Sequence, residues 1–478
     1  MSNTPIYREP ARDIPVLGSY DVVVCGGGPA GCAAAIAAAR HGARTLLVEK
    51  HGYLGGATVA QLVCVVLSTN GVDFQGVWHE YASGLRRRGG MTELKGAGSG
   101  QLSGAVDPEV VKYVWDDLVD GAGVTQLLHA YGATAIIEDG AARGVLVETR
   151  AGRQAILAER VIDCTGDGIV AAQSGVPWEQ GDGLHKWAMA LTKVFRMGNV
   201  HWPDDHPNPE AMARFRTDVH AAVERGELTT PLIAENVTAE NDRLTMYING
   251  KLWQLTTYRN EYLSVMSRVL RVDPLDPFDF TRAEREGRTQ AWECAEAYRR
   301  FAPGFAEAFL LDTSAQIGLR SSRRVRGLAT VSEDDALTFR KYPDGIARSS
   351  WEIDLWPAVS YTTSPVDRTT PEYAARRERM IAGEYFDIRY GCLVTQGIDN
   401  LLVAGRCISA EHSAQGSLRI QQTCMATGQA AGTAAAMSLR AAVTPRELDA
   451  LVLVRQLEQD RAAVEPAFDC LAEPKVAK

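Results

Sequence analysis

Three glycines near the N-terminus, Gly26, Gly28 and Gly31, have the spacing of a dinucleotide-binding turn. The first allows a tight turn, the second lets the backbone approach a pyrophosphate, and the third lets a helix pack closely against a strand. Glu49 follows the next predicted strand, where a carboxylate can accept hydrogen bonds from a ribose diol. These residue types in this order predict that the chain binds a dinucleotide.

The chain around these glycines predicts the β-α-β unit that such a site requires. Residues 20–25 form an apolar strand, a helix of small residues runs to about Gly42, and residues 44–48 form a second strand. The N-terminus of the helix would direct N–H groups and a partial positive charge toward the phosphates. The sequence therefore predicts both the chemistry and the elements that position it.

Two later segments carry side chains that could contact a substrate. Arginines are concentrated in residues 320–326, and a guanidinium group can bind a carboxylate or phosphate through two hydrogen bonds. His412, Ser417 and Arg419 lie between a buried strand and a small-residue helix near the C-terminus. A histidine titrates near neutral pH, so His412 is the candidate acid–base group, and Arg320 and Arg419 are candidates for holding an anionic or carbonyl group. Structural ion pairs and a structural histidine are the alternatives.

Composition narrows the class of protein. The chain has 478 residues and a formal charge of −9, so it is long enough for two or three domains and is not expected to bind nucleic acid. It contains no apolar run long enough to span a membrane and no apolar signal core at its N-terminus. Its nine cysteines form no CxxC pair, which favours a reducing, cytoplasmic location and no disulfide framework. A loop is expected at 201–207, with no metal site.

The order of predicted elements indicates an α/β protein with a discontinuous Rossmann-type domain. We expect this cofactor-binding domain in residues 1–175 and 385–440, with a β-meander from about 124 to 163. Residues 176–384 are expected to form an inserted α+β substrate or cap domain, and residues 441–478 a C-terminal helical tail. Residues 94–104 are rich in glycine and predict a mobile loop. Residues 107–120 predict a helix capped by Asp107.

The motifs together resemble the FAD-dependent oxidoreductase family, which shares its nucleotide fold with glutathione reductase, fumarate reductase and the flavin subunit of heterodisulfide reductase. The matching stretches are GGGPAG (26–31), Glu49, LGGAT (54–58), DPE (107–109), VIDCTGDG (161–168), IGLRSSRRVRG (317–327), DNLLVAGRCIS (399–409) and GQAAGTAAA (428–436). The chain lacks the spaced cysteines of the cluster-bearing relatives, so no iron–sulfur cluster is expected.

The resemblance implies FAD as the cofactor and a set of residues that bind it. Gly26–Gly31 would hold the pyrophosphate, Glu49 the adenosine ribose, Gly405 and Arg406 the ribityl-phosphate part, and Gly428 to Gly432 the isoalloxazine. A helix N-terminus near the ring would stabilise negative charge on it. The implied cofactor-binding residues are Gly26, Gly28, Pro29, Ala30, Gly31, Glu49, Lys50, Gly55, Gly56, Ala57, Thr58, Thr134, Thr165, Gly166, Asp167, Gly405, Arg406, Gln421, Gly428 and Ala431.

The implied activity is hydride transfer between the flavin and a small polar molecule, by alcohol oxidation or by reduction of an activated double bond. Three alternatives stay open: a flavin monooxygenase, an electron-transfer flavoprotein subunit of a larger complex, and an FAD protein acting on RNA, against which the acidic charge counts. The electron acceptor or donor is unknown. Covalent attachment of the flavin and assembly into a homo-oligomer are left open.

Overall fold

The structure is a computed structural model of the chain. It describes residues 7–462 with the exception of 93, 98–100, 202–208, 230–256, 259, 266 and 360–369.

The main sheet is built around strand β1 (Val16–Cys25), whose last four residues are buried. Parallel neighbours follow on both sides in the order β6 (Thr125–Leu127), β2 (Thr45–Val48), β1 and β9 (Gly152–Asp163). Strand β17 (Leu401–Val403) comes from the far end of the chain and pairs in parallel with the end of β9. Such uninterrupted apolar strands are typical of a parallel sheet that is covered on both faces.

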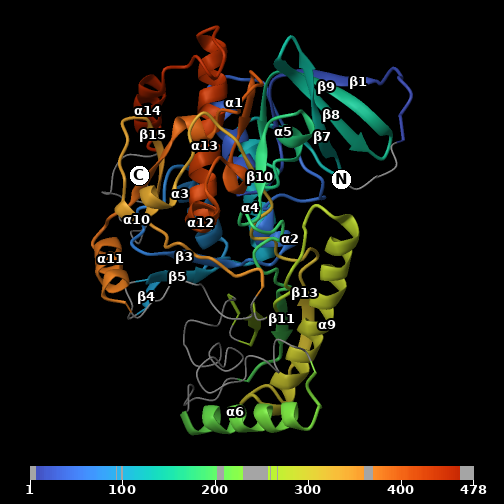
Figure 1. The fold of residues 1–478 in the computed structure, drawn as a ribbon, viewed down its shortest axis with the longest axis vertical. Helices are drawn as coiled ribbons and strands as arrows, with labels where there is room; N and C mark the ends of the chain where they lie inside the picture. Colours follow the sequence, from blue (N-terminus) through green and yellow to red (C-terminus); the bar gives the residue numbers. More distant parts are fainter. Residues whose placement is uncertain are drawn as a thin grey trace.

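Strand β9 is long enough to belong to two sheet regions. Residues 155–163 of β9 pair in parallel with β1, and residues 152–157 pair antiparallel with β8 (Ala141–Thr149), which pairs with β7 (Tyr131–Glu138). Figure 1 shows this meander at the opposite end of the molecule from helix α6. The α/β class, the discontinuous Rossmann-type sheet and the β-meander are thus confirmed.

The ends of three strands meet at one edge of the main sheet. Cys25 of β1 lies opposite Asp163 of β9, and Val403 of β17 lies opposite the same residue from the other side. The segments that follow these strands, beginning at Gly26, Cys164 and Ala404, therefore emerge side by side. In open α/β sheets ligands bind at this carboxyl edge.

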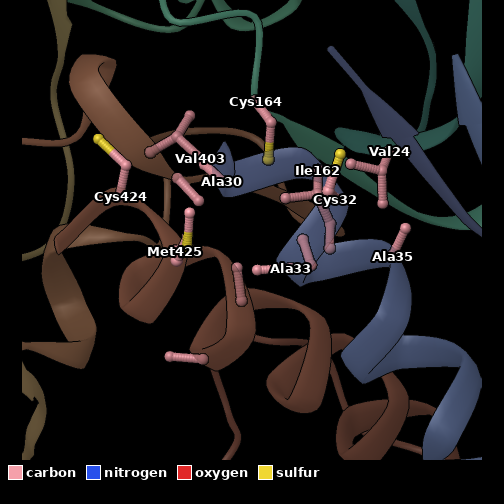
Figure 2. Close-up of a cluster of buried hydrophobic side chains, with 14 of the residues drawn as sticks. Val24, Ala30, Cys32, Ala33, Ala35, Ile162, Cys164, Val403, Cys424 and Met425 are labelled. Atoms are coloured by element: carbon pink, nitrogen blue, oxygen red, sulfur yellow. The ribbon is translucent and has the colours of Figure 1, made fainter. Parts of the chain in front are cut away.

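Helices α1 (Pro29–Arg40) and α13 (Gln421–Arg440) cover this sheet together and pack closely on each other. A Cβ atom on Gly428 would lie 2.0 Å from the carbonyl oxygen of Ala30, and one on Gly432 would lie 2.0 Å from that of Ala34. Figure 2 shows the small side chains that make this approach feasible, among them Ala30 and Ala33 of α1. Glycine and alanine along both helices thus serve close packing.

The remaining elements complete the fold. Those before the inserted region are α2 (Ala57–Ala60), β3 (Val65–Ser68), α3 (Val77–Arg87), β4 (Lys95–Ala97), β5 (Gln101–Ala105), α4 (Pro108–Gly121) and α5 (Ile169–Gln173). Those inside it begin with β10 (Trp178–Gln180), β11 (Phe195–Gly198), α6 (Pro209–Glu224), β12 (Tyr262–Ser264), α9 (Pro277–Phe301), β13 (Phe309–Thr313) and β14 (Arg323–Val325). The chain continues with α10 (Glu333–Thr338), β15 (Gly345–Ser349), α11 (Pro371–Ile381), β16 (Phe386–Arg389), η1 (Tyr390–Cys392), η2 (Gly405–Cys407), α12 (His412–Leu418) and α14 (Ala450–Gln459).

Two local predictions have different outcomes. Asp107 caps α4 by accepting a hydrogen bond from the N–H of Glu109, as its position before Pro108 predicts. The glycine-rich stretch 94–104 was expected to be a loop, and its described residues instead form β4 and β5, which pair with β3 in a three-stranded sheet. Pairing across the sheet compensates for the weak strand preference of glycine.

A second hydrophobic core lies at one end of the molecule, where α9 packs against β13 and α6 packs against α9 (Figure 1). Strand β11 is flanked by β12 and β13 in an antiparallel sheet. The large buried side chains of this core are Phe195, Phe215, Tyr262, Tyr298 and Phe305. Val325, Ile346 and Phe386 join the core of the main sheet instead, and the domain boundaries at 176 and 384 remain predictions.

The C-terminal part of the described chain packs on the main body. Leu453 and Leu457 of α14 are buried, and His41 at the end of α1 pairs with Asp460 at 2.7 Å. None of the helices in the part of the chain described here is both long enough and apolar enough to cross a membrane.

Candidate active site

A cavity lies at the carboxyl edge where β1, β9 and β17 end. Most residues predicted for cofactor binding line it: Gly26, Gly28, Pro29, Ala30, Glu49, Lys50, Gly56, Ala57, Thr165, Gly166, Asp167, Gly405, Arg406 and Gln421. A further set of lining residues, called here the distal group, is formed by Gln61, Val63, Val65, Leu67, Thr192, Val194, Arg320, Trp351, Asp354, Arg419 and Gln422. The cavity therefore extends from the predicted nucleotide site to a wall formed by residues from distant parts of the chain.

Backbone without side chains forms the part of the cavity beside the N-terminus of α1. Gly26 has a φ of +104°, and a Cβ there would lie 2.5 Å from the carbonyl oxygen of Cys164. Gly56 has a φ of +53°, and its Cβ would lie 2.7 Å from the Cα of Gly28. No side chain caps α1, so its first N–H groups are directed to this opening. This cradle suits a pyrophosphate that must approach the backbone closely.

Glu49 is held rigidly by the turn that it faces. One carboxylate oxygen accepts a hydrogen bond from the N–H of Gly27 at 2.6 Å, and the other accepts from the N–H of His51 at 2.8 Å. The residue is only 6 % exposed. Because each carboxylate oxygen has two lone pairs, both can accept a further bond from a ribose hydroxyl. The arrangement fits the predicted role of this acid.

Arg406 connects three segments around the cavity. Its Nε donates to the carbonyl oxygen of Gly166 at 2.9 Å, and Nη2 pairs with Asp167 at 2.5 Å. Nη1 donates to the carbonyl oxygen of Leu319. The carboxylate of Asp167 also accepts a hydrogen bond from Ser322 at 2.6 Å. The guanidinium group thus fixes the turn after β9 against the segment that leads into β14.

The N-terminus of α13 is the second helix end at the cavity. Its N-cap residue, Ile420, provides no side-chain hydrogen bond, and the helix begins with Cys424 donating to the carbonyl oxygen of Ile420 at 3.0 Å. Ile420, Gln421 and Gln422 line the cavity. The free N–H groups of the first turn carry a partial positive charge, so this wall favours negative charge in its neighbourhood.

Two arginines stand on the wall of the distal group. Arg419 donates through Nη2 to the carboxylate of Asp354 at 2.6 Å, and its Nε is buried with no hydrogen-bond partner among the described residues. Arg320 donates through Nη1 to the carbonyl oxygen of Ala190 and to the hydroxyl of Thr192 at 2.9 Å. A guanidinium group on a cavity wall is a suitable contact for a carboxylate or carbonyl oxygen.

Two thiols of the cavity wall, those of Cys164 and Cys424, are expected to be unreactive. Burial raises the pKa of Cys164 well above its usual value and raises that of Cys424 to about 12. Both thiols therefore stay protonated near neutral pH, and neither is the activated thiolate that nucleophilic chemistry needs.

Some predicted residues support the cavity without lining it. A Cβ on Gly31 would lie 1.7 Å from the carbonyl oxygen of Gly26, so this glycine allows α1 to pack on the turn. Thr58 donates to the side chain of Gln421 at 2.9 Å. Thr134 lies in β7 beside Ser174, and Gly55 directly precedes the lining residue Gly56; neither lines the cavity itself.

The placement of Gly428 and Ala431 beside the isoalloxazine is not what the structure shows. Gly428 packs against the backbone of Ala30, and Ala431 is fully buried within the same helix pair. Neither residue lines the cavity. The small side chains at these positions are explained by helix packing, which requires the same residue types as close approach to a flat ring.

His412 lies away from the cavity lining. It begins α12, beside the backbone of Gly181 and the guanidinium of Arg324, and its Nδ1 is buried without a hydrogen-bond partner in the described chain. Burial and then the charge of Arg324 lower its pKa, so the imidazole is neutral near pH 7. This position does not support an acid–base role for His412 at the cavity.

Most of the distal group was not foreseen from the sequence. Val63, Val65 and Leu67 alternate along an extended segment, a period that signals a strand but says nothing of a ligand. Trp351 and Asp354 belong to a segment without a recognisable motif. They reach the cavity because the segment crosses α12, where a Cβ on Gly416 would lie 2.9 Å from the backbone nitrogen of Asp354.

Side chains that could bind a metal ion are not clustered in the described residues. Among these residues, no cluster of three or more histidine, cysteine, aspartate or glutamate side chains could hold a metal ion. Of the segment 201–207, only His201 lies within the described chain.

Comparison with known proteins identifies the family to which the sequence is similar. A family model described as "FAD dependent oxidoreductase" matches residues 21–460. A dihydrolipoyl dehydrogenase from Trypanosoma brucei brucei is 52% identical over 54 residues, which span 11% of this chain and 11% of that enzyme.

Two solved structures are similar over most of the chain. A geranylgeranyl bacteriochlorophyll reductase-like protein from Thermoplasma acidophilum is 12% identical with a TM-score of 0.44, covering 93% of this chain and 84% of its own. GidA from Aquifex aeolicus is 14% identical with a TM-score of 0.45, covering 92% of this chain and 67% of its own.

Proposed function

Because the chain belongs to the FAD-dependent oxidoreductase family and FAD is its cofactor, we propose that it transfers a hydride between FAD and a small polar substrate that carries a carboxylate or carbonyl group. The reaction is either oxidation of an alcohol or reduction of an activated double bond. The observation that carries the proposal is that Arg419, held by Asp354, lines the same cavity as the nucleotide cradle.

The nucleotide half of the cavity binds and orients the cofactor. The cradle beside α1 would hold the pyrophosphate, and Glu49 would accept hydrogen bonds from a ribose. When bound, FAD supplies the two-electron chemistry by accepting or donating a hydride. The uncapped N-terminus of α13 favours negative charge at the distal end of the cavity.

The distal group binds the substrate and moves its proton. Arg419 would hold the anionic or carbonyl oxygen, and Val65 and Val194 exclude water with apolar surface. Asp354 is the carboxylate of the distal group, so it replaces His412 as the group assigned to proton transfer with a substrate hydroxyl. A carboxylate held by an arginine is already oriented when the substrate arrives.

Anaerobic bleaching of the bound flavin by a panel of small alcohols, hydroxy acids and enones tests this function. We expect a hydroxy acid or unsaturated acid to react, and its methyl ester to react less well. In the Arg419→Met variant the KM for the acid should rise roughly tenfold to a hundredfold, since a hydrogen bond to a charged group contributes about 1.5–3 kcal/mol.

Arg389→Met is the matched control. Arg389 also pairs with an aspartate, Asp344 at 3.0 Å, and does not line the cavity. Its loss should leave the KM unchanged. Equal KM increases in both variants, or equal reaction of acid and ester, would contradict the proposed role of Arg419.

A further inference from the structure

Two consecutive glutamines at the start of α13 hold the backbone of a distant extended segment. Gln421 donates through Nε2 to the carbonyl oxygens of Val63 and Val65, at 3.0 and 3.3 Å. Gln422 donates through Nε2 to the carbonyl oxygen of Leu67 at 3.0 Å. Both glutamines are at least nine-tenths buried. The helix is thereby fixed to the chain around β3 by side-chain amides.

The segment that the glutamines hold is an open strand edge on the cavity. Strand β3 pairs with β5 in the register Val66 opposite Gly104. The held carbonyls belong to the alternate positions 63, 65 and 67, and alternate residues of an extended chain direct their carbonyls to one side. These same three residues line the cavity. The glutamines therefore position the edge of β3 that borders the cavity.

The orientation of the Gln421 amide is set by a third element. Thr58 of α2 is 1% exposed and donates through its hydroxyl to Oε1 of Gln421 at 2.9 Å. With Oε1 accepting from Thr58 and Nε2 donating to the carbonyl oxygens of Val63 and Val65, the amide is fixed in one orientation. The N–H groups of the first helical turn are left directed at the cavity.

We infer that Gln421 and Gln422 are positioning residues that seat the ring end of FAD. They lock the edge of β3 to α13 and keep the positive end of that helix beside the place where negative charge gathers on reduction. The inference takes one premise from the proposed function, namely that the flavin ring occupies the end of the cavity formed by the distal group. Releasing the lock should weaken FAD binding and make reduction less favourable.

Substitution of both glutamines by methionine tests the inference. Methionine is similar in size and flexible, and it lacks the amide donors. For Gln421→Met, Gln422→Met and the double variant, the full chain with FAD is used to measure the flavin dissociation constant, the visible spectrum and the midpoint potential.

In the double variant we expect FAD to bind at least about tenfold more weakly. Relative affinity for the reduced over the oxidised form should fall about tenfold, which for a two-electron couple is a shift of about 30 mV to more negative potential.

Gln429→Met is the control on the same helix. Its Oε1 accepts a hydrogen bond from the N–H of Val77 at 3.0 Å, and it does not line the cavity. This variant should lose thermal stability while keeping the spectrum and the potential of the unmodified protein. If the Gln421 and Gln422 variants also lose only stability, the pair is structural and the inference fails.

The experiment separates this inference from the proposed function because it uses no substrate. If no compound of the substrate panel bleaches the flavin, the proposed function is contradicted. The midpoint potentials of the glutamine variants can still be measured and still test this inference. Where the double variant does not fold, each single variant still compares binding and potential with the Gln429→Met control.

Discussion

Asp73 is a carboxyl group with no exposed surface, set just beyond the strand that the two glutamines hold. Ser68 of β3 donates to one of its oxygens, and the other oxygen has no hydrogen-bond partner among the described residues. Burial raises the pKa of Asp73 to about 6, and the hydrogen bond from Ser68 offsets part of this effect. The group is therefore neutral in mildly acidic solution and becomes charged as the pH approaches 7.

The raised pKa gives a prediction at the residue scale. Between about pH 4 and pH 6 the folded protein binds more protons at Asp73 than the unfolded chain does, so the contribution of this group to stability falls as the pH rises. The free energy of unfolding of the unmodified protein, relative to Asp73→Asn, should fall by at most about 3 kcal/mol over this range. Denaturant titrations of both proteins at several pH values measure the difference. A difference that does not change with pH would show that the group titrates normally.

Helices α1 and α13 show how whole elements depend on small residues. Their backbones approach so closely at Gly428 and Gly432 that a single methyl group would meet a carbonyl oxygen of α1. The N-termini of both helices line the same cavity, so their packing also sets the distance between the nucleotide cradle and the distal group. Because protein interiors have few voids, a small displacement of one of these helices is transmitted to the other.

Gly428→Ala tests the element scale. Alanine favours helix more than glycine does, so without the close contact this change would stabilise by up to about 1 kcal/mol. Since the added methyl group would overlap the backbone of Ala30, we expect a net loss of about 1–3 kcal/mol in the free energy of unfolding.

Gly121→Ala is the control for that experiment. Gly121 is the last residue of α4, and a Cβ there would meet no atom within 4 Å. This variant should be as stable as the unmodified protein or slightly more stable. If Gly428→Ala and Gly121→Ala are equally stable, α1 and α13 can move apart without a measurable loss in the free energy of unfolding.

Across the whole molecule, Arg406 joins parts of the chain that are far apart in sequence. It contacts the turn after β9, the aspartate in that turn and the segment before β14, while its own position follows β17. Its side chain is 16% exposed, so these contacts are shielded from water. One guanidinium fork therefore joins segments that line the cavity.

Arg406→Lys keeps the charge and removes the fork, so it tests the whole-molecule scale. We expect a fall of about 1–3 kcal/mol in the free energy of unfolding, because a lysine ammonium cannot replace all three contacts. Arg340→Lys is the matched surface change, since Arg340 is 49% exposed and pairs with Asp334. Exposed pairs of this kind contribute about 0–1 kcal/mol. A similar small effect of both substitutions would argue against the role given to Arg406.

The nucleotide half of the site was predictable because its requirements are local. A tight turn, close approach of a phosphate and close helix packing each need a glycine at one position, and Gly26, Gly28 and Gly31 follow within six residues. The following helix and strand obey the same short-range rules. The family resemblance extended this to Gly405 and Arg406, which also line the cavity.

The distal half was decided by tertiary structure. Histidine has the right chemistry for proton transfer, yet the start of α12 places His412 beside Arg324 and away from the cavity. Gly428 has the residue type of a ligand contact, yet it packs against Ala30. The sequence by itself determined the α/β fold and the FAD cradle, because those depend on neighbouring residues. Only the tertiary structure brought Gln421 to Val63 and Asp354 to Arg419, because these contacts arise from packing between segments that share no local pattern.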